Sequence, residues 1–171
     1  VAKDLLSQRV VGVLWADPDQ RMMAVGSPMG VIAGVIPRTN PTSTVLFKAL
    51  AAVKAGNAIV MAPHPRATRS CFRAAEVMAS AATKAGAPEG LISCLEKVTL
   101  EGTRELMSHS EVDLIMATGS GDMVKVCYSS GKPTIAVGAG NVPVYVDRSA
   151  PDIQDAAEMI VASKSFDNGT A

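Results

Sequence analysis

The sequence predicts an α/β fold, with a mostly parallel β-sheet and helices on both of its faces. Short apolar runs alternate with longer amphipathic stretches along most of the chain, and Gly or Pro stands at many of the junctions. Of the 171 residues, 48% are hydrophobic and 19% are charged, so the chain can bury one sizeable core. Successive strand–helix units of this kind form parallel sheets that are covered on both sides.

The first two units are expected as strands at 31–36 and 57–62 and helices at 41–56 and 67–86. Asn40 can cap the first of these helices, Pro41 suits its first position, and Gly56 suits its exit. The helical period turns one face of each helix toward the core. The inward residues are Val45, Leu46, Ala49, Leu50 and Val53 in the first helix, and Cys71, Phe72, Ala75, Met78, Ala79 and Ala82 in the second.

The later elements are expected as strands at 91–95, 112–118, 133–138 and 142–147, and helices at 100–109, 121–131 and 151–165. Thr99 precedes the helix at 100–109. The apolar period of the last helix directs one set of side chains inward, namely Ile153, Ala156, Ala157, Ile160 and Val161.

The first 30 residues follow a different pattern. "VVGVLWADPDQRMMAV" predicts two short strands joined by the turn "ADPDQ", a hairpin outside the main sheet. We therefore expect a lead-in with a short hairpin at 1–30, followed by a cofactor-binding domain at 31–171.

Composition and charge exclude several classes of function. Lys plus Arg and Asp plus Glu both total 16, so the chain has no electrostatic reason to bind nucleic acid or anionic lipid. No apolar run has the length of a membrane span, and the N-terminal residues do not form a signal peptide. The 3 cysteines lack CxxC spacing, which favours free thiols in a reducing, cytoplasmic compartment.

The loops that follow the expected strands are the candidate ligand site, because parallel sheets bind ligands beyond the carboxyl ends of their strands. They read "PRTNPTS", "PHPRATRS", "GSGD" and "GAGN". In "TGSGD", two glycines permit close approach of a backbone, and the helix that follows favours a diphosphate. A tight turn without a ligand explains this stretch equally well. The dinucleotide motif GxGxxG is absent, because "GAGNVP" lacks the third Gly and opens onto a strand.

Isolated reactive residues carry less weight. His64 stands between two prolines, where it either contacts a ligand or stiffens the loop, and His109 lies near the end of a helix. With two histidines and no paired carboxylates at ligand spacing, no metal site is expected. Cys127 falls on the inward face of its helix, so burial is expected rather than a nucleophilic role.

Six stretches together resemble the CoA-acylating branch of the aldehyde dehydrogenase superfamily, which includes acylating acetaldehyde dehydrogenases and the aldehyde half of bifunctional aldehyde–alcohol dehydrogenases. They are "IPRTNPTS", "GNAIVMAPHPRA", "AGAPEGLI", "LIMATGSGDMVKVCYSSGKP", "VGAGNVPVYVD" and "SKSFDNGT". The resemblance covers about residues 10–171. It implies a Rossmann-like cofactor domain whose catalytic domain is absent from this chain.

In this family the residues that resemble "SFDNGTA" lead directly to the catalytic cysteine, which would follow Ala171. The implied reaction is covalent: a cysteine thiolate attacks a short aldehyde, hydride passes to NAD, and CoA takes the acyl group from the resulting thioester. The chain alone is therefore expected to be inactive. The resemblance further implies a homo-oligomeric parent, with a fused alcohol dehydrogenase domain left open.

The resemblance also implies roles for individual residues. Val137 stands where hydrolytic relatives carry a glutamate that activates water, so CoA rather than water is the expected acceptor. Thr39 aligns with the oxyanion-holding Asn of those relatives, but the neighbouring Asn40 is our preferred amide donor. Their ribose-binding Lys and Glu align with Ala62 and Pro65, so NAD is expected from branch similarity and NADP is left open. The implied cofactor-binding residues are Pro37, Arg38, Thr39, Asn40, Pro41, Thr42, Pro63, His64, Gly119, Ser120, Gly121, Asp122, Val137, Gly138 and Gly140.

Three alternatives remain open at the level of sequence. A standalone module that binds NAD or CoA would need no cysteine, and an assembly domain would need no catalysis. A semialdehyde reductase with phosphate as acceptor fits "SFDNGT" and "VGAGN" less well. Nothing in the sequence specifies the aldehyde.

Overall fold

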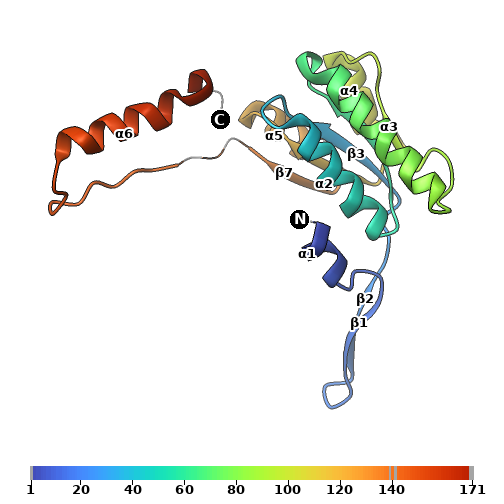
Figure 1. Ribbon diagram of the computed structural model, residues 1–171. Helices are drawn as coiled ribbons and strands as arrows, with labels where there is room; N and C mark the ends of the chain where they lie inside the picture. The colour runs from blue at the N-terminus through green and yellow to red at the C-terminus, as the bar shows by residue number, and fades with distance from the viewer. Residues whose placement is uncertain (1, 139, 141, 170–171) are drawn as a thin grey trace. The chain divides into compact units, whose positions relative to one another are not determined.

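The computed structural model describes residues 2–138, 140 and 142–169, and it divides into two compact units, Val1–Gly138 and Ala139–Ala171. The first unit contains a five-stranded parallel sheet in the order β5-β4-β3-β6-β7 (Figure 1). Its strands are Val31–Ile36 (β3), Ala58–Pro63 (β4), Ile92–Cys94 (β5), Leu114–Thr118 (β6) and Thr134–Val137 (β7). The predicted α/β class and parallel sheet are confirmed.

Helices cover both faces of this sheet, as predicted, and each face has its own core. The four helices are Pro41–Lys54 (α2), Thr68–Lys84 (α3), Leu100–Ser108 (α4) and Gly121–Tyr128 (α5). On one face, Val45 of α2 and Cys71 of α3 pack with Ile32, Ile59 and other strand residues. On the other face, Met107 of α4 and Cys127 of α5 pack with residues that include Ile115. The expected burial of Cys127 is confirmed.

The strand order reverses between β3 and β6. From β3 the chain moves outward to β4 and β5, and it then crosses to the other side of β3 to form β6 and β7. We call the boundary between β3 and β6 the seam. In open parallel sheets, the carboxyl end of such a boundary is where ligands bind.

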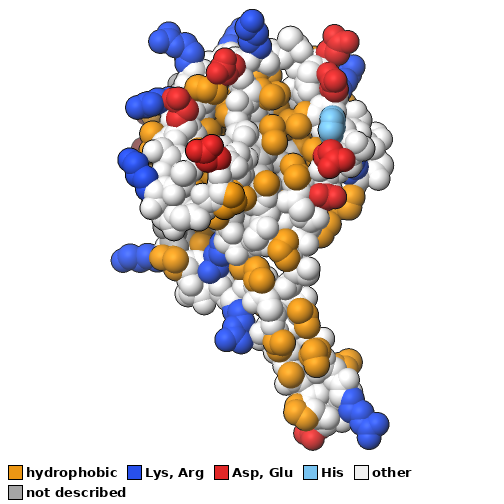
Figure 2. All heavy atoms as spheres, turned by 90° about the vertical axis from the view of Figure 1, so that its right-hand side faces the viewer, with side chains coloured by type: hydrophobic (Ala, Val, Ile, Leu, Met, Phe, Trp, Pro, Cys, Tyr) orange, Lys and Arg blue, Asp and Glu red, His pale blue; other side chains and the backbone are white. Residues whose placement is uncertain are grey.

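The N-terminal residues form a separate antiparallel pair, Gly12–Asp17 (β1) and Met22–Gly26 (β2), so the predicted hairpin is confirmed. Asp17 Oδ1 accepts from the main-chain N–H groups of Asp19 and Gln20, at 3.0 Å each, which fixes the turn. A short helix, Ala2–Ser7 (α1), was not predicted. Hydrophobic side chains remain exposed along the hairpin (Figure 2), among them Val13, Trp15, Met22, Met23 and Val25.

Three predictions for the outward-facing segments are wrong. No strand forms at 142–147 among the described residues, because nothing described pairs with this segment. The last helix, Ile153–Ser165 (α6), forms with Asp152 as its cap, but none of its described residues is buried, and Ile153 and Val161 are more than half exposed. In α2, Leu46 and Leu50 face outward instead of inward.

After α6 comes a 3-10 turn, Phe166–Gly169 (η2). Ala171, on which the expectation of a following cysteine rests, lies outside the described residues. Among the helices that the structure describes, none is long and apolar enough to cross a bilayer.

Gly30, at the start of the seam, is expected to tolerate no side chain. It has a φ of +127°, and a Cβ there would overlap the Asp113 carboxylate. That carboxylate accepts from the Val31 N–H at 2.8 Å, so Gly30→Ala would break a contact that joins β3 to the entry of β6. Gly131 also has a positive φ, but a Cβ there meets nothing within 4 Å. We expect Gly30→Ala to cost about 2 kcal/mol more than Gly131→Ala in urea unfolding. Equal costs would mean that backbone strain alone acts at Gly30.

Candidate functional site

The candidate site lies at the carboxyl ends of the strands that flank the seam. The exits of β3 and β4 are joined by a hydrogen bond from the His64 N–H to the Ile36 carbonyl, 3.0 Å long. The exits of β6 and β7 are joined in the same way by the Gly119 N–H and the Val137 carbonyl, at 3.1 Å. Four of the predicted ligand-binding segments therefore start from one edge of one sheet.

The β3 exit carries the predicted segment Pro37–Thr42. Pro37 is partly buried, and Arg38, Thr39 and Asn40 are exposed. Pro41 opens α2 as predicted, and Thr42 is exposed in its first turn. The side chain of Asn40 does not cap the helix, however, which corrects the prediction.

Asn40 uses its main-chain oxygen rather than its side chain to start α2. That oxygen accepts from the Thr44 N–H at 3.1 Å and from the Thr44 hydroxyl at 2.8 Å. The side-chain oxygen Oδ1 accepts from the Thr39 hydroxyl at 3.2 Å. Among the described residues, Nδ2 makes no hydrogen bond, so its two N–H groups are free for solvent or a ligand.

The β6 exit leads into residues 119–121, Gly-Ser-Gly, which we call the glycine turn. Ser120 caps α5 by accepting from the Met123 N–H at 3.4 Å, and Gly121 and Asp122 are exposed in the first turn. A Cβ on Gly119 would come within 3.3 Å of Met123, whereas a Cβ on Gly121 would meet nothing within 4 Å. Because the first N–H groups of a helix have no partner within it, Gly121 presents free donors at an open surface.

The negative charge of Asp122 opposes the binding of an anion at the glycine turn. Its carboxylate occupies the first turn of α5, where it already complements the positive end of the helix. Lys125 Nζ lies 3.9 Å from Asp122 Oδ1 and offsets part of the charge, although both side chains are exposed. A diphosphate at this place would therefore depend on main-chain donors and small residues more than on net charge.

The β4 exit begins at Pro63, the buried last residue of the strand. His64 follows it, partly buried, and His64 Nδ1 accepts from the Arg66 N–H at 3.1 Å at the start of a 3-10 turn, Pro65–Ala67 (η1). Burial, together with the positive charges of Arg38 and Arg66, lowers the pKa of His64. The imidazole is therefore neutral at pH 7, and Nδ1 is its acceptor.

The β7 exit is only partly defined. Val137 ends the strand and is 60% exposed, and Gly138 follows it. Gly140 belongs to the second unit, whose position relative to the first is not determined. Val137 and Gly138 therefore lie at the edge that carries the other predicted residues, and the prediction for Gly140 stays a prediction.

Sequence reasoning missed Lys48, a lysine in the apolar stripe of α2. It is 2% exposed, and Nζ donates to the Val35 carbonyl at 2.8 Å and to the Met116 carbonyl at 2.7 Å, so it bridges the seam. Burial lowers the pKa of Lys48 to about 7, while the nearby Cys127 acts in the opposite direction. The signal was its position between Val45 and Ala52, on the inward face of the helix.

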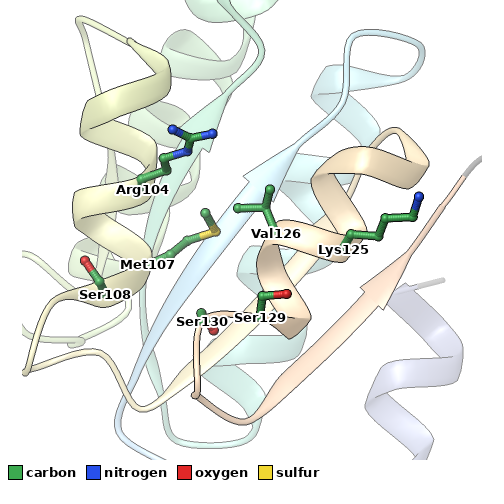
Figure 3. A pocket seen from close by; sticks show the side chains of 7 residues that line it. All are labelled: Arg104, Met107, Ser108, Lys125, Val126, Ser129 and Ser130. Carbon is green, nitrogen blue, oxygen red and sulfur yellow. The ribbon is translucent and has the colours of Figure 1, made fainter.

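Sequence reasoning also missed a groove between α4 and α5 (Figure 3). Met107 of α4 and Val126 of α5 point into it and form an apolar floor, while Arg104 reaches over one side. The groove has a volume of about 470 Å³, and the remaining lining residues are Ser108, Lys125, Ser129 and Ser130. The groove lies along the carboxyl-terminal half of α5, whereas the glycine turn lies at the start of that helix.

The three cysteines are free thiols: Cys71 lies in α3, Cys127 lies in α5, and Cys94 ends β5, a border strand away from the seam. Burial raises the pKa of Cys71 and of Cys127, and it raises the pKa of Cys94 to about 12. A thiol with a raised pKa is a poor nucleophile at neutral pH. In the described part of the chain, no three His, Cys, Asp or Glu residues gather closely enough to hold a metal ion.

Comparisons with known proteins agree with one another. The model of the aldehyde dehydrogenase family matches residues 2–171. The bifunctional aldehyde-alcohol dehydrogenase of Escherichia coli (strain K12) is 46% identical over 162 residues, which cover 95% of this chain and 18% of that protein. An acetylating aldehyde dehydrogenase from Geobacillus thermoglucosidasius superposes with a TM-score of 0.87 at 50% identity, over 99% of this chain and 37% of that one.

A propionaldehyde dehydrogenase from Rhodopseudomonas palustris, solved with bound CoA, superposes with a TM-score of 0.72 at 42% identity. The match covers 83% of this chain and 32% of that one. This chain thus spans well under half the length of each of these relatives.

Proposed function

The chain belongs to the aldehyde dehydrogenase family, and from this premise we propose that it is the cofactor-binding part of a CoA-acylating aldehyde dehydrogenase. The proposed reaction converts a short aldehyde, NAD and CoA to an acyl-CoA and NADH, or the reverse. The observation that carries the proposal is that the exits of β3, β6 and β7 lie at one edge of one sheet, at the seam and directly beside it. Identity of 46–50% to acylating relatives supports the reaction type.

The residues at the seam fit a nicotinamide dinucleotide. Gly121 offers main-chain donors at an open surface for the diphosphate. NAD supplies the oxidation when it is bound. The chain holds and orients it, with the exits of β3 and β7 on either side of the reacting end. NADP remains an alternative.

Thiol transfer rather than hydrolysis is supported by Val137. Its side chain is apolar and exposed at the β7 exit, so it has no group with which to deprotonate water. A thioester beside it would persist until CoA arrives. We propose Asn40 as the oxyanion donor, because its amide N–H groups have no acceptor among the described residues.

The burial of the three thiols determines whether these 171 residues alone can supply the nucleophile. With Cys71 and Cys127 fully buried and every thiol pKa raised, none of the three is suited to attack an aldehyde. We propose that the nucleophile is contributed from outside these residues and that the chain alone does not oxidise aldehydes. A standalone NAD- or CoA-binding module, or an assembly domain, is the alternative.

The setting of the enzyme is proposed from its relatives and its thiols. The bifunctional Escherichia coli relative supports a fused alcohol dehydrogenase domain, and a homo-oligomer is proposed for the parent. Free cysteines fit the cytoplasm. The division into a lead-in at 1–30 and an NAD-binding domain at 31–171 remains part of this proposal.

Calorimetric titration with NAD, NADP and CoA tests the cofactor role. Gly121→Glu is the matched variant, because its side chain enters open space and a glutamate in the first turn favours the helix. We expect affinity for NAD to fall at least about tenfold through repulsion of the diphosphate, with Tm unchanged. Ser80→Glu, on the exposed face of α3, adds the same charge elsewhere and should leave the affinity unchanged. If Gly121→Glu and Ser80→Glu bind NAD with the same affinity, the diphosphate does not bind at the glycine turn.

A further inference from the structure

Arginines gather at the exits of β3 and β4 without acidic partners. We call Arg38, Arg66 and Arg69, together with His64, the arginine cluster. All three arginines are exposed, and none forms a salt bridge within the described residues. The sequence contains no Asp or Glu between Asp19 and Glu76, so β3, α2, β4 and the first two turns of α3 carry no negative side chain. The exits of β3 and β4 therefore carry positive side chains without an acidic residue on either of these two segments.

The cluster is held in place by the sheet. Ile36 pairs with Pro63 across β3 and β4, so Arg38 and His64 leave the sheet side by side. His64 Nδ1 accepts from the Arg66 N–H, which fixes the turn that carries Arg66. Both Arg38 and Arg66 are near enough to His64 for their charges to lower its pKa.

A groove of about 530 Å³ follows the turn, and two of the three arginines of the cluster line it. Arg66 and Arg69 line it together with Pro65, Ala67, Thr68 and Ser70. The Thr68 hydroxyl donates to the Pro65 carbonyl at 3.1 Å, and the Ser70 hydroxyl donates to the Ala67 carbonyl at 3.0 Å. Because both hydroxyls are engaged, the guanidinium groups of Arg66 and Arg69 are the side-chain donors that remain for a ligand in this groove.

The place of the cluster in the sheet indicates its ligand. β4 is the strand next to β3 on the outer side of the seam, which makes it the second strand of a doubly wound nucleotide-binding sheet. In dinucleotide-binding sheets, residues at the exit of that strand contact the adenosine ribose. A carboxylate there binds a free 2′-hydroxyl, whereas an arginine accommodates a 2′-phosphate. In this chain the exit carries arginine and no carboxylate.

We propose that the arginine cluster binds a phosphomonoester on an adenosine ribose, which is the 3′-phosphate of CoA or the 2′-phosphate of NADP. This inference rests on the proposed function and adds to it the residues that select among adenosine ligands. Arginine forks bind such phosphates in a bidentate manner. NAD lacks this group and gains nothing from the cluster.

Two ligand pairs test the proposal by calorimetric titration of the chain. The first is CoA against 3′-dephospho-CoA, and the second is NADP against NAD. We expect the phosphorylated member of at least one pair to bind about tenfold more tightly, and that pair identifies the source of the phosphate. In the double variant Arg66→Gln/Arg69→Gln this preference should disappear, while binding of 3′-dephospho-CoA and NAD is unchanged.

Arg73→Gln is the matched control, because Arg73 lies one turn further along α3 and pairs with Glu76 at 3.1 Å. It should keep the preference. If neither pair shows a preference, or if the double variant keeps it, the arginine cluster does not read the phosphate and the proposed function still stands. If none of the four ligands binds, the proposed function fails and this inference fails with it.

Discussion

Lys48→Met is expected to remove a rise in stability that the wild-type chain shows as pH increases above 7. Burial holds the pKa of Lys48 at about 7 in the folded chain, against 10.5 when it is exposed. Between these values the unfolded chain binds one proton more than the folded chain, so the free energy of unfolding rises with pH. The slope is up to about 1.4 kcal/mol per pH unit. Below pH 7 both states are protonated and the cost of burying the charge is complete.

The three cysteine thiols set the upper limit of the pH range in which the slope of stability reports on Lys48 alone. Burial raises the pKa of the three cysteines above 9.0, so the unfolded chain loses those protons first and stability falls at higher pH. Urea unfolding from about pH 7 to 8.5 therefore isolates Lys48. Lys84→Met, at an exposed position of α3, should keep the wild-type slope. A Lys48→Met chain with that same slope would show that Lys48 stays charged in the folded state.

Asn40→Ala, in an active enzyme that contains this sequence, is expected to lower kcat by about 100-fold. The N–H groups of Asn40 Nδ2 have no acceptor among the described residues, so they are available to an oxyanion that forms at the reacting carbon. Because this contact strengthens in the transition state, KM for the aldehyde should change little. Steady-state kinetics with saturating NAD and CoA give both values.

Thr39→Val is the control for Asn40, because it removes the neighbouring hydroxyl and keeps the side-chain volume. The Thr39 hydroxyl already donates to Asn40 Oδ1, so its loss should affect kcat only through the orientation of the amide. A large loss in Thr39→Val with unchanged turnover in Asn40→Ala would transfer the oxyanion role to Thr39.

Helix and strand positions were predictable where one face of an element meets a core within the chain. α3 is the clearest case: Cys71 and Ala75 are buried as its period predicts, against strands that the same sequence supplies. The same reasoning failed for α6, in which no described residue is buried, and for 142–147, which pairs with no described strand. A periodic apolar face indicates that an element packs against something, but it does not identify the packing partner.

The candidate site was predictable as a set of loops and less so as a set of side chains. Strand exits follow from topology, so the segments at Pro37, Gly119 and Val137 were found together. Lys48 was missed because charged residues are ordinarily placed outside, and only the carbonyls of Val35 and Met116 make its burial tolerable. Such pairing across the seam is a property of the fold and is absent from local sequence.

The lengths of the outermost strands bear on how this chain would aggregate. β5 and β7, with 3 and 4 residues, are the borders of the main sheet, and such short borders offer an incoming chain few main-chain groups to pair with. The hairpin is the opposite case, because its strands of 6 and 5 residues carry exposed apolar side chains and pair only with each other among the described strands. Intermolecular strand addition should therefore begin at β1 and β2, and gatekeeper charges against aggregation belong there rather than on the sheet.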